Sequence, residues 1–169
     1  NTNKSMVKAL SKILGSITEE LDKFKPDLVL TGFDIGANLA TTIAAAHMNI
    51  PVAHIQGGEL TGSIDESIRH AMSKFSHIHF PATEDSRQRL IRMGENPDYV
   101  FNVGCPSIDT ILETPEMNKK ILEEKFGIDF SKPNILLIQH PVTTESESSR
   151  NQILTTIEVI NEMDIQALV

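Results

Sequence analysis

Strand-like and helix-like patterns alternate along this chain, and this alternation limits the fold more than any other feature. Apolar runs of strand length lie at residues 28–32, 50–55, 77–82 and 99–104. Stretches with helical spacing of apolar residues separate them, at 38–48, 65–75 and 84–93, and one precedes them at 6–21. The strands recur about every 25 residues, which is typical of βαβ units and a parallel sheet.

This rhythm changes after Gly104. Residues 105–133 hold two short helical patterns, a proline break and a polar tail. A second βαβ unit then begins, with a strand at 134–139, a helix near 150–162 and a strand pattern at 165–169. We therefore predict most of an N-terminal Rossmann-like domain at 1–112, a linker at 113–132 and the start of a C-terminal Rossmann-like domain at 133–169. Because the last strand pattern is cut at Val169 and the first residue is Asn1, we expect a piece of a longer protein.

Composition excludes several classes of function. The 169 residues include 15 basic and 23 acidic side chains, a net charge of −8, which argues against a nucleic-acid partner. No apolar run approaches the roughly 18 residues of a membrane span, and no signal-peptide pattern is visible, so we expect a cytoplasmic protein without a membrane partner. The single cysteine, Cys105, excludes an internal disulfide and a cysteine-rich zinc site.

The loop after the second strand carries the most chemistry. Ligands of open parallel sheets bind outside the carboxyl ends of the strands. Here Gly57 and Gly58 allow a sharp turn or close approach of a ligand, and Glu59 follows them in a stretch that is no helix start. Asp65 opens the next helix, where it is either a helix-capping group or a catalytic carboxylate, and Arg69 stands four residues further on, able to pair with it.

Two other strand ends are candidates. Asp34 lies between Gly32 and Gly36, in a loop where it is either a helix cap or a catalytic carboxylate. His140 ends the strand at 134–139, and a hydroxyl-rich loop follows it into a helix; this suits a phosphate-bearing ligand, the alternative being a polar interdomain loop.

The remaining candidates favour structural roles. His54 is expected to be a hydrogen-bonded core residue. His77 and His79 form an H-x-H pair that could bind zinc, but no third ligand is evident nearby, so we predict no metal site. Cys105 has no histidine partner in the sequence and is expected to be structural.

Three ordered motifs together resemble a known family. They are "HIQGGELTGSIDESIRHAMSKFSHIHF" (54–80), "NVGCPSID" (102–109) and "QHPVTTE" (139–145). They are similar to the hydrolysing UDP-N-acetylglucosamine 2-epimerases of the sialic-acid-pathway type, over about residues 25–145. The resemblance implies a two-domain GT-B-type fold with a nucleotide sugar in its cleft. It also implies a UDP-sugar partner, no cofactor and a homo-oligomer, either dimer or tetramer.

The family's chemistry assigns roles to the acidic residues. UDP is eliminated, and water adds to the glycal intermediate, so that UDP-N-acetylglucosamine gives N-acetylmannosamine and UDP. One carboxylate stabilises the oxocarbenium character of the ring and another takes the C2 proton. The resemblance implies the catalytic residues Asp34, Glu59, Asp65 and His140. The substrate-binding residues it implies are Gly57, Gly58, Arg69, His70, Thr143 and Thr144.

The chain departs from the family pattern at two places. Ile35 follows Asp34 where the family's "GDRF" has an arginine, and Gln56 stands where several relatives have an acid. Three alternatives therefore stay open. They are a non-hydrolysing 2-epimerase, a hydrolysing 2-epimerase for a 2,4-diacetamido nucleotide sugar, and a nucleotide-sugar-binding module without catalysis.

Overall fold

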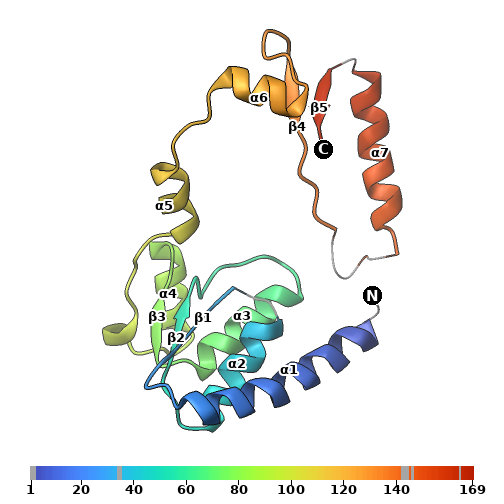
Figure 1. The fold of residues 1–169 in the computed structure, drawn as a ribbon. Helices are drawn as coiled ribbons and strands as arrows, with labels where there is room; N and C mark the ends of the chain where they lie inside the picture. The colour runs from blue at the N-terminus through green and yellow to red at the C-terminus, as the bar shows by residue number, and fades with distance from the viewer. Residues whose placement is uncertain (1–2, 34–35, 142–144, 146, 164) are drawn as a thin grey trace. The chain divides into compact units, whose positions relative to one another are not determined.

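A computed structural model describes residues 3–33, 36–141, 145, 147–163 and 165–169. The chain forms two compact units that divide between Thr110 and Ile111 (Figure 1). The first unit alternates helices and strands in the order α1 (Asn3–Phe24), β1 (Val29–Gly32), α2 (Gly36–His47), β2 (Val52–Ile55), α3 (Ile64–Phe75), β3 (Ile78–Phe80) and α4 (Glu84–Arg92). A short 3₁₀ helix, η1 (Pro97–Tyr99), follows α4, and α5 (Pro106–Glu113) crosses the division between the units.

The first unit has a parallel sheet with the order β1-β2-β3. Val29 is paired with Val52, and His54 with His79. The predicted Rossmann-like α/β class is therefore confirmed. No regular strand forms at 99–104, where one was expected, but part of the pairing is present. Val100 makes an isolated parallel bridge with His79, and the N–H groups of Phe101 and Val103 donate to the carbonyls of His79 and Pro81 at 2.9 and 3.2 Å. The 3₁₀ helix that begins at Pro97 takes Tyr99 out of the extended conformation, and residues 101–103 are exposed.

Aliphatic side chains, among them the alanines of α2, build the core of the first unit. Leu21, Val29, Ala44, Ala45 and Val52 form one buried cluster. It joins α1 and α2 to the strands β1 and β2, and α2 contacts α3 as well. The alanine-rich face of α2 brings the helix close to the sheet, so β1 and β2 have a fixed support beneath the loops that follow them.

The second unit is a smaller βαβ arrangement. It contains α6 (Lys119–Phe126), β4 (Asn134–Leu136), α7 (Ser149–Glu162) and β5 (Gln166–Leu168), and its two strands pair in parallel with Ile135 opposite Ala167. The second βαβ pattern of the sequence is thus confirmed, although β4 is shorter than the predicted strand at 134–139. Among the described residues, no helix has the length and apolar character needed to cross a membrane.

A buried histidine connects β2 to α3. His54 is fully buried, and its Nδ1 lies 3.1 Å from the Ser73 hydroxyl, which in turn lies 3.1 Å from the carbonyl oxygen of Arg69. Burial, together with the nearby His79 and Arg69, lowers the pKa of His54 to about 4. The core role expected for His54 is therefore confirmed.

Acid should destabilise the first unit through His54. The folded pKa of about 4 lies below the ordinary value of 6.5, so the unfolded chain takes up a proton first as the pH falls. The contribution of His54 to the free energy of unfolding is complete above pH 6.5 and is lost progressively between pH 6.5 and 4, by about 3 kcal/mol in all. Urea unfolding at several pH values measures this loss.

The matched variants are His54→Gln and His47→Gln. The glutamine side chain of the first variant cannot titrate, so we expect a shallower pH dependence there despite a lower stability at pH 7.5. His47 is exposed, and its replacement should leave the slope of the wild type unchanged. Equal slopes in all three proteins would contradict the assignment to His54.

Candidate active site in the loop after β2

The loop from Gln56 to Gly62 begins with a residue in an unusual conformation. Gln56 has a φ of 58°, and its backbone N–H donates to the Phe80 carbonyl at 2.9 Å. Its side-chain amide donates to Cys105 Sγ at 3.0 Å, immediately before α5. Backbone N–H groups of Ile108 and Ser107 lower the pKa of the Cys105 thiol, and the hydrogen bond from Gln56 acts in the same direction. The start of the loop is thus tied to β3 and to the beginning of α5.

The two glycines are required by close packing. A Cβ on Gly57 would lie 2.9 Å from Nδ1 of His54 and 3.0 Å from the hydroxyl of Ser73. Gly58 has a φ of 85°, and a Cβ there would collide with the carbonyl oxygen of Ser86 and lie 3.1 Å from Cγ of Leu90. The loop therefore rests directly on β2, α3 and α4. The space left by the missing side chains of the two glycines, where close approach of a ligand was predicted, is occupied by atoms of these elements.

Two arginines hold consecutive carbonyl groups of the loop. Arg69 of α3 is only 5% exposed, and its Nη1 donates to the Glu59 carbonyl at 2.8 Å. Arg89 of α4 donates from Nη1 to the Gly58 carbonyl. Arg69 was predicted to bind substrate. In the structure, the guanidinium donates this hydrogen bond to the backbone of Glu59.

The start of α3 is fixed by its own polar groups. Ser63 is the N-cap, and its hydroxyl oxygen accepts from the Asp65 N–H at 3.2 Å. The same hydroxyl lies 2.9 Å from Oδ2 of Asp65. Glu66 reaches back to the N–H groups of Thr61 and Gly62 at 2.8 and 2.9 Å. The hydrogen bonds from Gly62 and Thr61 lower the pKa of Glu66 and close the loop. Ser63, and not Asp65, is therefore the helix cap.

This framework leaves the carboxylate of Glu59 available. Glu59 is half-buried, and no hydrogen bond or ion pair of its carboxylate is found within the part of the chain that the structure describes. Asp65, six residues on, is also half-buried and has the Ser63 hydroxyl beside it. His70 lies on the next turn of α3; its buried Nδ1 has no hydrogen-bond partner among the described residues. The loop and α3 thus present two carboxylates and an imidazole from one short segment.

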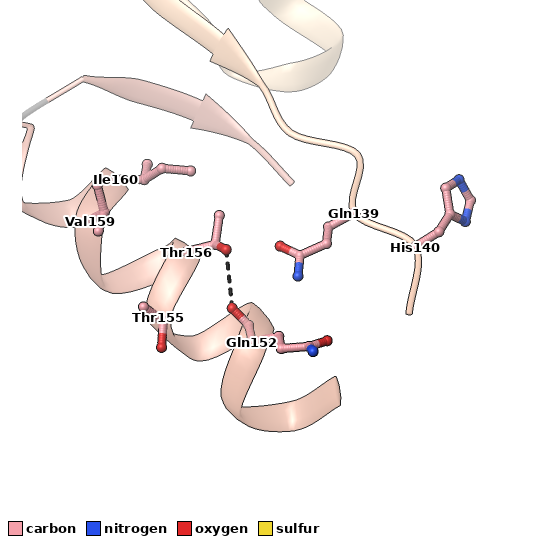
Figure 2. Close-up of a pocket in the computed structure, with 7 residues that line it drawn as sticks. All are labelled: Gln139, His140, Gln152, Thr155, Thr156, Val159 and Ile160. Atoms are coloured by element: carbon pink, nitrogen blue, oxygen red, sulfur yellow. Dashed lines mark hydrogen bonds between the residues drawn. The ribbon is translucent and has the colours of Figure 1, made fainter. Parts of the chain in front are cut away.

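His140 lies in the second unit. It is exposed and lines an open groove of about 690 Å³ along α7, together with residues such as Gln139, Gln152 and Thr156. Figure 2 shows the Gln139 side chain directed toward α7, whereas the His140 ring points away from that helix. Asp34, Thr143 and Thr144, which the sequence also selected, lie outside the described residues.

The H-x-H pair has partners of its own. Nδ1 of His77 accepts from the Val52 N–H at 3.2 Å, and Nε2 of His79 lies 3.2 Å from Oε2 of Glu95. Lys74 Nζ contacts the other carboxylate oxygen of Glu95 at 2.6 Å. Burial lowers the pKa of His79, and Glu95 opposes that shift. Within the described ranges, no three His, Cys, Asp or Glu side chains are grouped to hold a metal ion.

A parallel α/β unit with Glu59 in the loop beyond the carboxyl end of β2 and Asp65 in the first turn of α3 has the architecture of a Rossmann-like domain. The family model described as UDP-N-acetylglucosamine 2-epimerase matches residues 1–169. The chain belongs to this family.

Individual relatives agree with the family match. A UDP-N,N'-diacetylbacillosamine 2-epimerase (hydrolyzing) of Legionella pneumophila is 43% identical over 166 residues, which are 98% of this chain and 44% of that protein. A GDP/UDP-N,N'-diacetylbacillosamine 2-epimerase (hydrolyzing) of Campylobacter jejuni is 32% identical over 98% of this chain and 43% of that protein. The chain therefore spans less than half the length of these relatives.

A solved structure agrees with the fold. The UDP-GlcNAc 2-epimerase of Neisseria meningitidis, bound to UDP-GlcNAc, has a TM-score of 0.77 and 29% identity, over 96% of this chain and 47% of that one. The expected GT-B-type α/β fold is confirmed by this match.

Sequence reasoning missed two residues that shape the loop. Glu66 stands three positions after Ser63, in the S-x-x-E pattern of a capping box, which was a signal for its reach toward the preceding backbone. Arg89 had no such signal, because it is one of three arginines on an amphipathic helix and only the packing of α4 brings it to Gly58.

Replacement of Gly58 by alanine should cost more than the same change at Gly62. Both glycines have positive φ, 85° and 66°, so alanine adds about 1–2 kcal/mol of strain at either position. Only at Gly58 does the new methyl group collide with Ser86, which adds about 1–3 kcal/mol. Urea unfolding of both variants measures the difference, and equal losses would contradict the close contact between the loop and α4.

Proposed function

We propose that the whole protein is a hydrolysing 2-epimerase that acts on a UDP-linked 2-acetamido sugar. The observation that carries this proposal is that the backbone of Glu59 is fixed while its carboxylate is not engaged by the described residues. Its backbone carbonyl is held by the buried Arg69, while its half-buried carboxylate has no partner among the described residues. A structural carboxylate in so ordered a loop would be paired, whereas a general base needs an accessible oxygen on a fixed support.

The two carboxylates divide the chemistry between them. Glu59 takes the C2 proton of the sugar as the C1–O bond to UDP breaks, and the electron pair of the C2–H bond forms the C1–C2 double bond of a glycal. Asp65, with Ser63 beside it, stabilises the positive charge that develops on the ring. Water then adds its oxygen at C1 and a proton arrives at C2 from the opposite face, which gives UDP and the free C2-inverted sugar. His140, with Thr143 and Thr144, assists the departing diphosphate.

Relatives favour a diacetamido sugar as the substrate. Two proteins that match nearly the whole chain, at 43% and 32% identity, are described as hydrolysing epimerases of a diacetylbacillosamine nucleotide. A UDP-N-acetylglucosamine 2-epimerase of Neisseria meningitidis serogroup B is 34% identical over 86% of the chain. We therefore place UDP-N,N'-diacetylbacillosamine before UDP-N-acetylglucosamine, the substrate that the motifs alone implied.

The carboxylate of Glu59 should be required for turnover. In D₂O, the full-length protein should release free UDP and a sugar that carries one deuterium at C2. Glu59→Gln removes the base and should lower kcat by about 10²–10⁴-fold, since this is the usual contribution of general acid–base catalysis. UDP release and NMR of the product measure these outcomes.

The matched control is Asp85→Asn. Asp85 is an exposed acid in the first turn of α4, and its replacement removes the same charge without touching the loop. Its kcat should remain near that of the wild type. Protium retained at C2 would refute the elimination, and a UDP-linked product without free UDP would indicate the non-hydrolysing reaction instead.

A substrate panel tests the choice of sugar. With the full-length protein, kcat/KM for UDP-N,N'-diacetylbacillosamine should exceed that for UDP-N-acetylglucosamine by at least about 10-fold. A buried site that hydrogen-bonds the 4-acetamido group would reject a substrate that lacks it. A reversed preference would return the assignment to UDP-N-acetylglucosamine.

A further inference from the structure

The two peptide groups on either side of the Cα of Glu59 are both held by arginines. The peptide between Gly58 and Glu59 presents its carbonyl to Arg89, and the peptide between Glu59 and Leu60 presents its carbonyl to Arg69. The backbone dihedrals of Glu59 are rotations between these two peptide planes. Fixing both planes therefore fixes the direction in which the Cα–Cβ bond of Glu59 leaves the backbone.

The two arginines come from different helices with separate supports. Arg69 is buried on α3, and its backbone carbonyl accepts a hydrogen bond from the Ser73 hydroxyl. Arg89 is half-buried on α4, and its neighbour Leu90 is fully buried. The N-terminus of α4 is capped by Thr83, whose hydroxyl oxygen accepts from the Ser86 N–H at 3.1 Å. Each of the two helices therefore has supports of its own outside the loop.

The packing of Gly58 on α4 reinforces the contact of Arg89. The absent Cβ of Gly58 faces Ser86 and Leu90, which stand three residues before and one residue after Arg89 on that helix. One turn of α4 thus contacts Gly58 by packing and by a charged hydrogen bond. Charged donors form the stronger class of hydrogen bonds, so this turn is a rigid support for the loop.

From these contacts we infer that Arg89 is a positioning residue for the Glu59 carboxylate. This inference rests on the proposed function, in which Glu59 takes the C2 proton. Arg89 acts through the Gly58 carbonyl and touches no reacting atom. Its loss leaves one of the two peptide planes free to rotate, and the carboxylate then spends less time in line with the C2–H bond.

The test compares Arg89→Gln with Arg92→Gln in the full-length protein. Both changes remove one positive charge from α4, but Arg92 lies exposed in the last turn. Arg89→Gln should lower kcat by about 10- to 100-fold, because a misplacement of about 1 Å has effects of this size, and KM should change little. Arg89→Lys keeps the charge and one donor and should recover part of the loss, whereas Arg92→Gln should behave as the wild type.

A double-mutant cycle separates positioning from a general loss of structure. If Arg89 acts through Glu59, adding Arg89→Gln to Glu59→Gln should lower the residual rate of UDP release less than about 2-fold. Multiplicative losses would overturn the inference and leave the proposed function intact. An unchanged kcat in Glu59→Gln alone would instead refute the role of Glu59 in that function, and with it the inference.

Discussion

The hydrogen bond from the buried Arg69 to the Glu59 carbonyl is the contact on which the candidate site depends. A guanidinium that is almost completely buried is stable only where protein acceptors replace water. The loop supplies such an acceptor, at 2.8 Å. Because the buried guanidinium needs this acceptor, the hydrogen bond fixes the backbone of the loop. The loop contains three glycines and would otherwise be flexible.

Hydrogen bonds also fix the two ends of the loop. Each end has its own fixed point, with Gln56 bound to Phe80 and Cys105 at the start, and Glu66 bound to Thr61 and Gly62 at the end. Backbone groups are used for support, and the carboxylate of Glu59 has no partner among the described residues, as the proposed role of a general base requires. Such an arrangement suits catalysis because the geometry is established during folding and needs no reorganisation during the reaction.

Gln56, which stands where several relatives were expected to have an acid, has a structural role in this loop. An amide at this position donates to the sulfur of Cys105, and a carboxylate could not donate. Gln56 therefore joins the loop to the start of α5, and the acidic function that we propose rests on Glu59 and Asp65.

The sequence by itself determined the parallel α/β class and the second βαβ unit, because periodicity is a local property. Its glycines and acids also selected the loop after β2, which remains the proposed site. Its error was also local in origin: residues 99–104 have the composition of a strand, but the 3₁₀ helix at Pro97 delays the pairing until Val100, and no regular strand forms there. Only the tertiary structure decided that Arg69 binds the Glu59 carbonyl and that Arg89 supports Gly58. These roles depend on which side chains meet across helices and strands, and sequence spacing carries no information about contacts between residues 10 and 31 positions apart.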